Sequence, residues 1–218
     1  MSASELLMTL RAVRMALPVG SLRIDMSVHG GERLAILGPE GIGKSRLLRL
    51  MAGLTLPESG SVIRHDAGHV LGVLFRVPEL RFLCVTPREE VGLAPASRGL
   101  SGDLLLERVE RALSRAGLNK QHWDQPWHTF SAAEKYRLGM AILYALQPHV
   151  LLIDEPGNPL SDAGEAAFSE GLRHYCREQG AALVVFTSRM MRARLFGERV
   201  MRIVALDGNW GLVEGGES

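Results

Sequence analysis

Residues 38–45 read Gly38-Pro39-Glu40-Gly41-Ile42-Gly43-Lys44-Ser45, and this stretch decides the fold of the chain. It follows an apolar run, residues 34–37, and leads into an amphipathic segment that starts at Arg46. A buried strand, a glycine-rich turn and a helix are the context in which G-x-x-x-x-G-K-S binds phosphate. The glycines let backbone amides curl around the anion, and the helix N-terminus adds partial positive charge. The sequence therefore predicts a nucleoside triphosphate site formed by Gly38, Pro39, Glu40, Gly41, Ile42, Gly43, Lys44, Ser45 and Arg46.

A second motif, residues 150–156, supplies carboxylates for the same site. Four apolar residues are followed by Asp154 and Glu155, and we expect this strand to lie next to the strand that precedes the glycine-rich loop. Asp154 would then lie beside Ser45, and both would serve as ligands of Mg²⁺, a hard cation that prefers oxygen. Glu155 is the predicted catalytic residue, placed to polarise a water that attacks the γ-phosphate. Lys44 is expected to reach the β- and γ-phosphates.

The composition fits one cytoplasmic domain. With 218 residues and a formal net charge of +1, the chain can bury a sizeable core and has no charge excess for capturing nucleic acid or a membrane surface. The two cysteines, Cys84 and Cys176, have no metal-ligand spacing, so we interpret them as buried or incidental thiols. No apolar run is long enough to cross a bilayer. We therefore expect any association with a membrane to go through partners.

The order of patterns along the chain predicts an α/β fold. Weak alternation over residues 5–28 indicates a small N-terminal β region, and alternating strands and helices from residue 34 onward indicate a parallel core sheet. Residues 76–130 are predicted to form a mostly helical insertion, with a short helix bracketed by Pro87 and Pro95. Together with the next helix, this insertion makes a helical subdomain of about 76–146 within a single domain, 1–218.

Both motifs, and the segment Phe130-Ser131-Ala132-Ala133-Glu134-Lys135-Tyr136-Arg137 between them, resemble the nucleotide-binding subunits of ABC transporters. The resemblance covers about residues 8–206. Residues 75–82, 86–95 and 108–113 resemble more closely the ATPases of energy-coupling factor importers, which take up vitamins and transition-metal ions. The resemblance to ABC transporter subunits implies a P-loop NTPase fold with ATP and Mg²⁺ as cofactors.

The resemblance also implies partners. One is an integral membrane transporter subunit that docks near residues 76–95. The other is a second ATPase subunit, or a copy of this chain, in a head-to-tail dimer. ATP then lies between the P-loop of one subunit and the signature helix of the other, and the whole assembly sits on the inner face of the cell membrane.

The signature segment departs from the family pattern. The usual Leu-Ser-Gly-Gly-Gln is replaced by residues 130–134, in which Ser131 keeps the hydroxyl donor for the partner's nucleotide. Ala132 and Ala133 add Cβ atoms where the backbone must approach a phosphate, and Glu134 adds negative charge. Ser-x-x-Glu is also a capping box, which would start this helix without any ligand. Both interpretations remain open from the sequence.

Other positions also lack groups that, in the family, contact the nucleotide or its Mg²⁺. Arg76 matches the glutamine that contacts Mg²⁺ and the attacking water, Ser188 matches the histidine that contacts the γ-phosphate, and Ser161 matches an aspartate. The aromatic residue that stacks on adenine has no counterpart before the P-loop, where Arg14 or Met15 would have to cover the base instead. A lost stack lowers affinity by about 1 kcal/mol.

These residues lead to two hypotheses. The first is an ATP-binding subunit of an energy-coupling factor-like ABC transporter that hydrolyses ATP slowly at its own site. The second is a degenerate regulatory or assembly subunit that pairs with a competent ATPase. A role on DNA or ribosomes would need a basic stripe or a coiled-coil insertion, and the sequence has neither. We interpret Trp123 and Trp127 as packing the helical insertion, and the basic segment 189–194 as a solvated helix face.

Overall fold

A computed structural model describes residues 5–17, 20–66, 68–206 and 209–215. In these residues one mixed sheet has the strand order β4-β1-β2-β9-β8-β3-β7-β6-β5. The strands are β1 (Leu6–Ala16), β2 (Ser21–His29), β3 (Arg33–Leu37), β4 (Ser59–Arg64), β5 (Leu71–Leu74), β6 (Val150–Asp154), β7 (Ala182–Thr187), β8 (Arg199–Leu206) and β9 (Asn209–Glu214). The α-helices are α1 (Lys44–Met51), α2 (Pro87–Ser97), α3 (Gly102–Arg115), α4 (Ala132–Leu146), α5 (Asp162–Gln179) and α6 (Met190–Phe196). Short 3₁₀ turns are η1 (Pro78–Arg81), η2 (Lys120–His122) and η3 (Trp127–Thr129).

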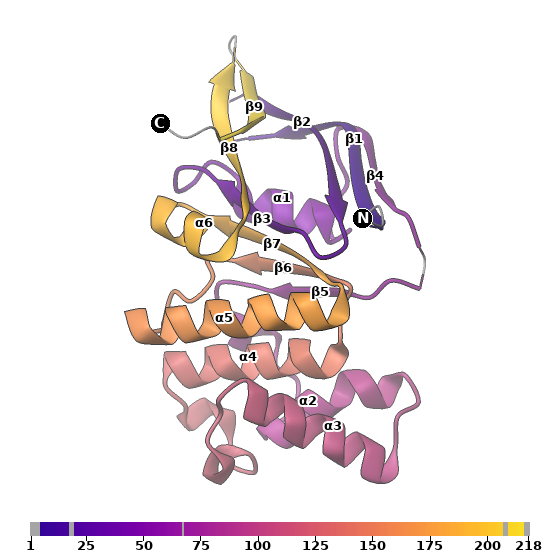
Figure 1. Cartoon of the computed structure of the whole chain (residues 1–218), viewed down its shortest axis with the longest axis vertical. Coiled ribbons are helices and arrows are strands. Elements are labelled where there is room, and N and C mark those ends of the chain that lie inside the picture. The colour runs from indigo at the N-terminus through magenta and orange to yellow at the C-terminus, as the bar shows by residue number, and fades with distance from the viewer. Residues whose placement is uncertain (1–4, 18–19, 67, 207–208, 216–218) are drawn as a thin grey trace.

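The N-terminal β region is antiparallel. Strand β1 pairs antiparallel with both β2 and β4, and β8 pairs antiparallel with β9. In Figure 1 these strands lie in the upper part of the molecule, above and beside α1 and α6. Alternate side chains of β2, such as Leu22, Ile24 and Val28, are buried, as the alternation of the sequence predicted.

The parallel half of the sheet contains β8, β3, β7, β6 and β5. Its central strands are buried on both faces, which explains their continuous apolar sequences. One expectation was wrong: β6 does not lie next to β3, because β7 lies between them and pairs with both. Strands β6 and β7 are consecutive and joined by the crossover helix α5, and consecutive parallel strands commonly pair.

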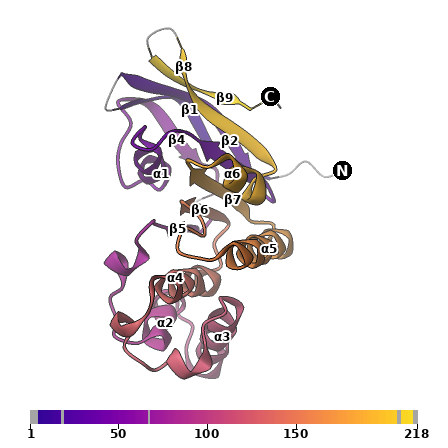
Figure 2. The same ribbon diagram turned by 90° about the vertical axis from the view of Figure 1, so that its left-hand side faces the viewer.

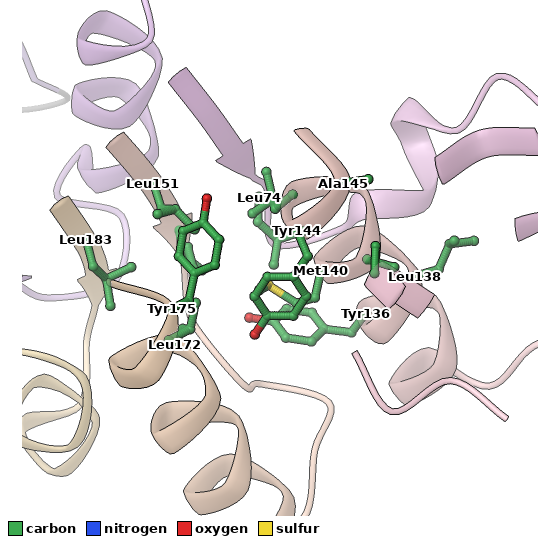
Figure 3. Packing of buried hydrophobic residues seen from close by; sticks show 14 of the residues in the cluster. Leu74, Tyr136, Leu138, Met140, Tyr144, Ala145, Leu151, Leu172, Tyr175 and Leu183 are labelled. Carbon is green, nitrogen blue, oxygen red and sulfur yellow. The ribbon is translucent and has the colours of Figure 1, made fainter. Parts of the chain in front are cut away.

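Helices α4 and α5 cover one face of the parallel strands, and α2 and α3 pack against α4 (Figures 1 and 2). Figure 3 shows the packing of this side, where Tyr136, Met140 and Tyr144 of α4 face side chains of α5 and of the sheet. Pro95 does not end α2, which continues to Ser97. On α3, Val109 and Leu113 are buried, whereas Leu106 is exposed.

Two further expectations concern the helical insertion and membranes. Trp123 is buried within the insertion, as predicted, and its indole N–H donates to the carbonyl of Leu118 at 3.0 Å. The extent of the helical subdomain, 76–146, stays a prediction. In the part of the chain that the structure describes, every helix is too short or too polar to cross a bilayer.

Candidate nucleotide-binding site

The glycine-rich loop connects β3 to α1, as the sequence predicted. Gly43 is the N-cap of α1, has φ of +103° and carries no side chain that could cap the helix. A Cβ atom at this position would lie 2.5 Å from Leu17 Cδ2 and would displace that side chain, and the positive φ would strain any other residue. The first turn of α1 contains no acidic residue. Its amides and its positive end are therefore available to an anion, which fits a phosphate group.

Lys44 lies inside this loop. Its Nζ donates to the carbonyls of Gly38 and Pro39, at 2.9 Å each, and lies 3.9 Å from Glu155 Oε1. Burial lowers the pKa of Lys44, and the nearby carboxylates of Glu155 and Asp154 oppose this shift. A buried lysine whose hydrogen bonds go to neutral carbonyls can transfer them to a phosphate and gain a charge-assisted contact.

Ser45 and Asp154 come together as predicted, although their elements are separated by one strand. The Ser45 hydroxyl donates to Asp154 Oδ2 at 2.6 Å across the end of β7. Burial raises the pKa of Asp154, whereas the hydrogen bond from Ser45 lowers it. A hydroxyl and a carboxylate at the mouth of a phosphate cleft are the oxygen ligands that suit Mg²⁺. These residues would hold the ion, which would neutralise part of the phosphate charge when bound.

Glu155 has an unusual backbone. Its φ of +47° lies in the left-handed region, which costs non-glycine residues about 1 kcal/mol or more and is concentrated at functional sites. Its side chain is buried, and both carboxylate oxygens accept hydrogen bonds from the end of β7. Oε1 accepts from the Ser188 amide at 2.9 Å, and Oε2 accepts from the Thr187 hydroxyl at 3.0 Å. Glu155 thus lines the cleft and is held firmly.

The basic segment 189–194 is not simply a solvated face, so that interpretation was wrong for Arg192. This residue is only 6% exposed, forms an ion pair with Glu165 of α5, and its Nη1 lies 3.8 Å from Glu155 Oε2. The sequence contains a signal that would have placed it inside. Phe196, four positions later on α6, is buried, and residues four apart share one face of a helix.

Three positions that depart from the family pattern have clear surroundings. Arg76 lines the same cleft as Lys44 and Asp154. Ser188 contributes its backbone amide to Glu155, while Ser161 caps α5 by accepting from the Gly164 amide at 3.3 Å. The serine at position 161 therefore serves local structure, whereas the amide at position 188 could come from any residue except proline.

Of the two candidates for covering the adenine base, Met15 is excluded and Arg14 stays a prediction. Met15 is 2% exposed in the core between the sheet and α1, so it cannot present a face to a base. Arg14 remains accessible, with its guanidinium near Ser21 and Glu58.

The signature segment forms the capping box. The Ser131 hydroxyl donates to Glu134 Oε2 at 2.7 Å, and the Ser131 amide donates to the same oxygen at 2.9 Å. The Glu134 amide in turn donates to Ser131 Oγ at 3.3 Å. The hydrogen bonds from Ser131 lower the pKa of Glu134, so its side chain is an anion at neutral pH. Ser131 does not line the cleft of the P-loop in this single chain.

Comparison with known proteins agrees with this geometry. Residues 22–158, more than half of the chain, match the family described as ABC transporter. The chain belongs to the ABC transporter family. It is 31% identical over 188 residues to the energy-coupling factor transporter ATP-binding protein EcfA1 of Listeria monocytogenes, covering 82% of this chain and 67% of that protein. It is 29% identical over 202 residues to EcfA1 of Bacillus subtilis, covering 88% and 70%. The chain thus spans about two thirds of the length of these curated relatives.

Solved structures show the same fold. The ABC transporter component cbiO1 of Clostridium perfringens, part of the complex cbiONQ, aligns with a TM-score of 0.80 at 23% identity, over 97% of this chain and 88% of that one. The dimeric ATP-binding cassette MJ0796, bound to ADP and phosphate, aligns with a TM-score of 0.78 at 24% identity, over 93% and 96%. The α/β P-loop NTPase fold predicted from the sequence is thereby confirmed, and the chain is an ABC ATP-binding domain.

Proposed function

We propose that this ABC ATP-binding domain binds ATP with Mg²⁺, powers an energy-coupling factor-type importer, and hydrolyses ATP slowly at its own site. The observation that carries the proposal is the composition of one cleft. Lys44 and the pair Ser45–Asp154 supply what binding of a triphosphate needs. The positions that would act on the γ-phosphate carry Arg76 and Ser188 instead. Loss of one preorganised donor commonly lowers a rate by a hundredfold or more.

The test separates binding from hydrolysis. Purified chain should bind a fluorescent ATP analogue in the presence of Mg²⁺, and turnover should stay well below about 1 s⁻¹, the lower end of typical enzymes. Replacing Arg76 by Gln and Ser188 by His together should raise the turnover. Rapid turnover by the unchanged chain that disappears in Glu155→Gln would refute slow hydrolysis, and absence of binding would refute the proposal as a whole.

We also propose a place for the subunit in an assembly on the inner, cytoplasmic face of the membrane. Exposed apolar side chains lie just before η1 and between η1 and α2, where Val77 is 43%, Leu83 is 83% and Val85 is 59% exposed. These residues fall in the segment 76–95, and an apolar surface of this kind suits a helix of an integral membrane subunit. Leu83→Glu should abolish co-purification with that subunit, whereas Leu56→Glu, at an equally exposed residue before β4, should leave it intact.

A second candidate function rests on the signature helix. Glu134 presents an anion at the N-terminus of α4, where a partner's γ-phosphate would have to approach. This arrangement favours a regulatory or assembly subunit that pairs with a competent ATPase. In such a pair, the ATP site formed by the partner's P-loop and this chain's α4 would be inactive. Mixing the chain with the second ATPase subunit would decide between the functions. A transporter subunit with its own slow turnover keeps Glu155-dependent hydrolysis in the mixture, whereas a regulatory subunit contributes none.

A further inference from the structure

The carboxylate of Glu155 accepts its hydrogen bonds from one side, while Lys44 Nζ lies 3.9 Å from Oε1 on the side of the P-loop. Its oxygens accept hydrogen bonds from the Ser188 amide and the Thr187 hydroxyl, and Arg192 Nη1 lies 3.8 Å from Oε2. These groups all belong to the end of β7 and to α6. A general base must present an oxygen to the water that it activates, within hydrogen-bond reach of the reacting phosphate. In the present arrangement, each oxygen already accepts a hydrogen bond from the end of β7.

Arg192 is anchored so that it cannot follow Glu155 out of this position. Its guanidinium forms an ion pair with Glu165 of α5 and donates to Asn158 Oδ1 at 3.0 Å, in the turn that follows β6. The side chain is buried, and a planar guanidinium held by several partners has little freedom to move. Nothing in nucleotide binding by the P-loop requires an arginine at this position.

We propose that Arg192 is a positioning residue that retains the Glu155 carboxylate on the side of β7 and α6 and thereby keeps hydrolysis slow. The inference rests on the proposed function, because it assigns Glu155 the role of general base in an ATP site. Glu165 shares the positive charge of Arg192 and so weakens its hold on Glu155. Arg192 therefore retains the Glu155 carboxylate, and Glu165 weakens this retention.

A purely structural role for Arg192 predicts a different outcome. If the ion pair with Glu165 only joined α6 to α5, its removal would lower stability and leave turnover equal or reduced. Retention of Glu155 predicts instead that turnover rises when Arg192 is removed. An increase in kcat is a result that loss of structure does not produce, so it separates the two roles.

The experiment uses the full chain with Mg²⁺ and ATP. Arg192→Met alone leaves two carboxylates buried near each other and risks misfolding, so the principal variant is the double substitution Arg192→Met with Glu165→Gln, which removes both members of the pair. We expect its kcat to rise about tenfold or more, with the dissociation constant for ATP unchanged, and the gain to disappear when Glu155→Gln is added. Glu165→Gln alone removes the competing carboxylate, so that Arg192 should hold Glu155 more strongly and kcat should fall. Arg192→Lys keeps the charge and should keep the low rate.

An unchanged or lower kcat in the folded double variant would overturn the inference, and so would a rise in kcat in Glu165→Gln alone. The dissociation constant distinguishes this failure from failure of the proposed function. If the unchanged chain binds Mg²⁺ and ATP but the double variant gains no turnover, only the role of Arg192 is wrong. If the unchanged chain does not bind ATP at all, the proposed function is wrong.

Discussion

Two helices of this molecule begin in opposite ways, although the family uses both N-termini for phosphate. Helix α1 starts at Gly43, without a side-chain cap and without an acidic residue in its first turn. Helix α4 starts at Ser131, and its first turn is closed by the reciprocal hydrogen bonds of Ser131 and Glu134. Figure 1 shows them on opposite sides of the parallel strands, α1 among the upper elements and α4 below.

The difference shows what makes a helix N-terminus a binding site. Every helix begins with amides that lack an intrahelical partner and with partial positive charge. At α1 the chain leaves these groups to a ligand, because glycine supplies the turn without a side chain. At α4 the Ser131 hydroxyl oxygen accepts from the Glu134 amide, and the Glu134 carboxylate places negative charge at the positive end. The same backbone geometry thus gives an anion site in one place and a self-contained helix start in the other.

The largest expected effect concerns α1, whose N-terminal amides are left to a ligand. Lys44→Ala removes a charge-assisted contact to the phosphates, which is worth about 1.5–3 kcal/mol, so ATP should bind about 10- to 100-fold more weakly. Lys135 occupies the corresponding early part of α4, and Lys135→Ala is the matched control, for which we expect no change. Titration with a fluorescent ATP analogue measures both. Equal losses in the two variants would show that α1 is not the site.

A smaller effect concerns the cation that accompanies ATP. Arg76 brings positive charge to the cleft near Asp154, so it can replace part of the charge that Mg²⁺ supplies. Arg76→Gln should weaken ATP binding in EDTA by about fivefold, the order of 1 kcal/mol for an exposed charge, and change binding in Mg²⁺ less. Arg49→Gln, on the exposed side of α1, is the control. An identical Mg²⁺ dependence in Arg76→Gln and the unchanged chain would contradict this role.

The comparison also shows which parts of the site a sequence can predict. The P-loop and both capping residues of α4 are local, because spacing along one turn fixes which groups meet. The pair Ser45–Asp154 was predicted from a fold pattern, and it survived a wrong strand order because both residues lie at the same edge of the sheet. The burial of Arg192 could have been read from its spacing to Phe196, but its partners Glu165 and Asn158 lie elsewhere in the chain and have no local signal.

The other departures from the family pattern also show what packing adds to the sequence. Met15 was a candidate for covering adenine because of its place in the sequence, but the packing of β1 turns it into the core. Ser161 and Ser188 could be recognised as losses of an aspartate and a histidine. Their local roles, a helix cap and an amide donor to Glu155, became visible only from the backbone geometry. Alignment with a family pattern identifies a missing group, whereas the structure identifies what the replacement does.

The smallest expected effect concerns α4, whose first turn is capped by Ser131 and Glu134. Ser131→Ala removes the cap of α4 and should lower the free energy of unfolding by about 1 kcal/mol near neutral pH, measured by urea denaturation. Thr129→Ala, whose hydroxyl donates only to the Pro126 carbonyl just before α4, is the control and should cost less.

The charge of Glu134 adds a pH dependence with a definite sign. Its pKa is lowered in the folded chain by the hydrogen bonds from Ser131, so its contribution is complete above the unfolded value of about 4.3 and is lost as the pH falls through the lower folded value. Glu134→Gln keeps the capping geometry without the charge. The stability of the unchanged chain relative to this variant should therefore fall between pH 6 and acid pH. A constant difference over that range would mean that Glu134 does not act as an anion at α4, and the contrast with α1 would then rest on hydrogen bonding alone.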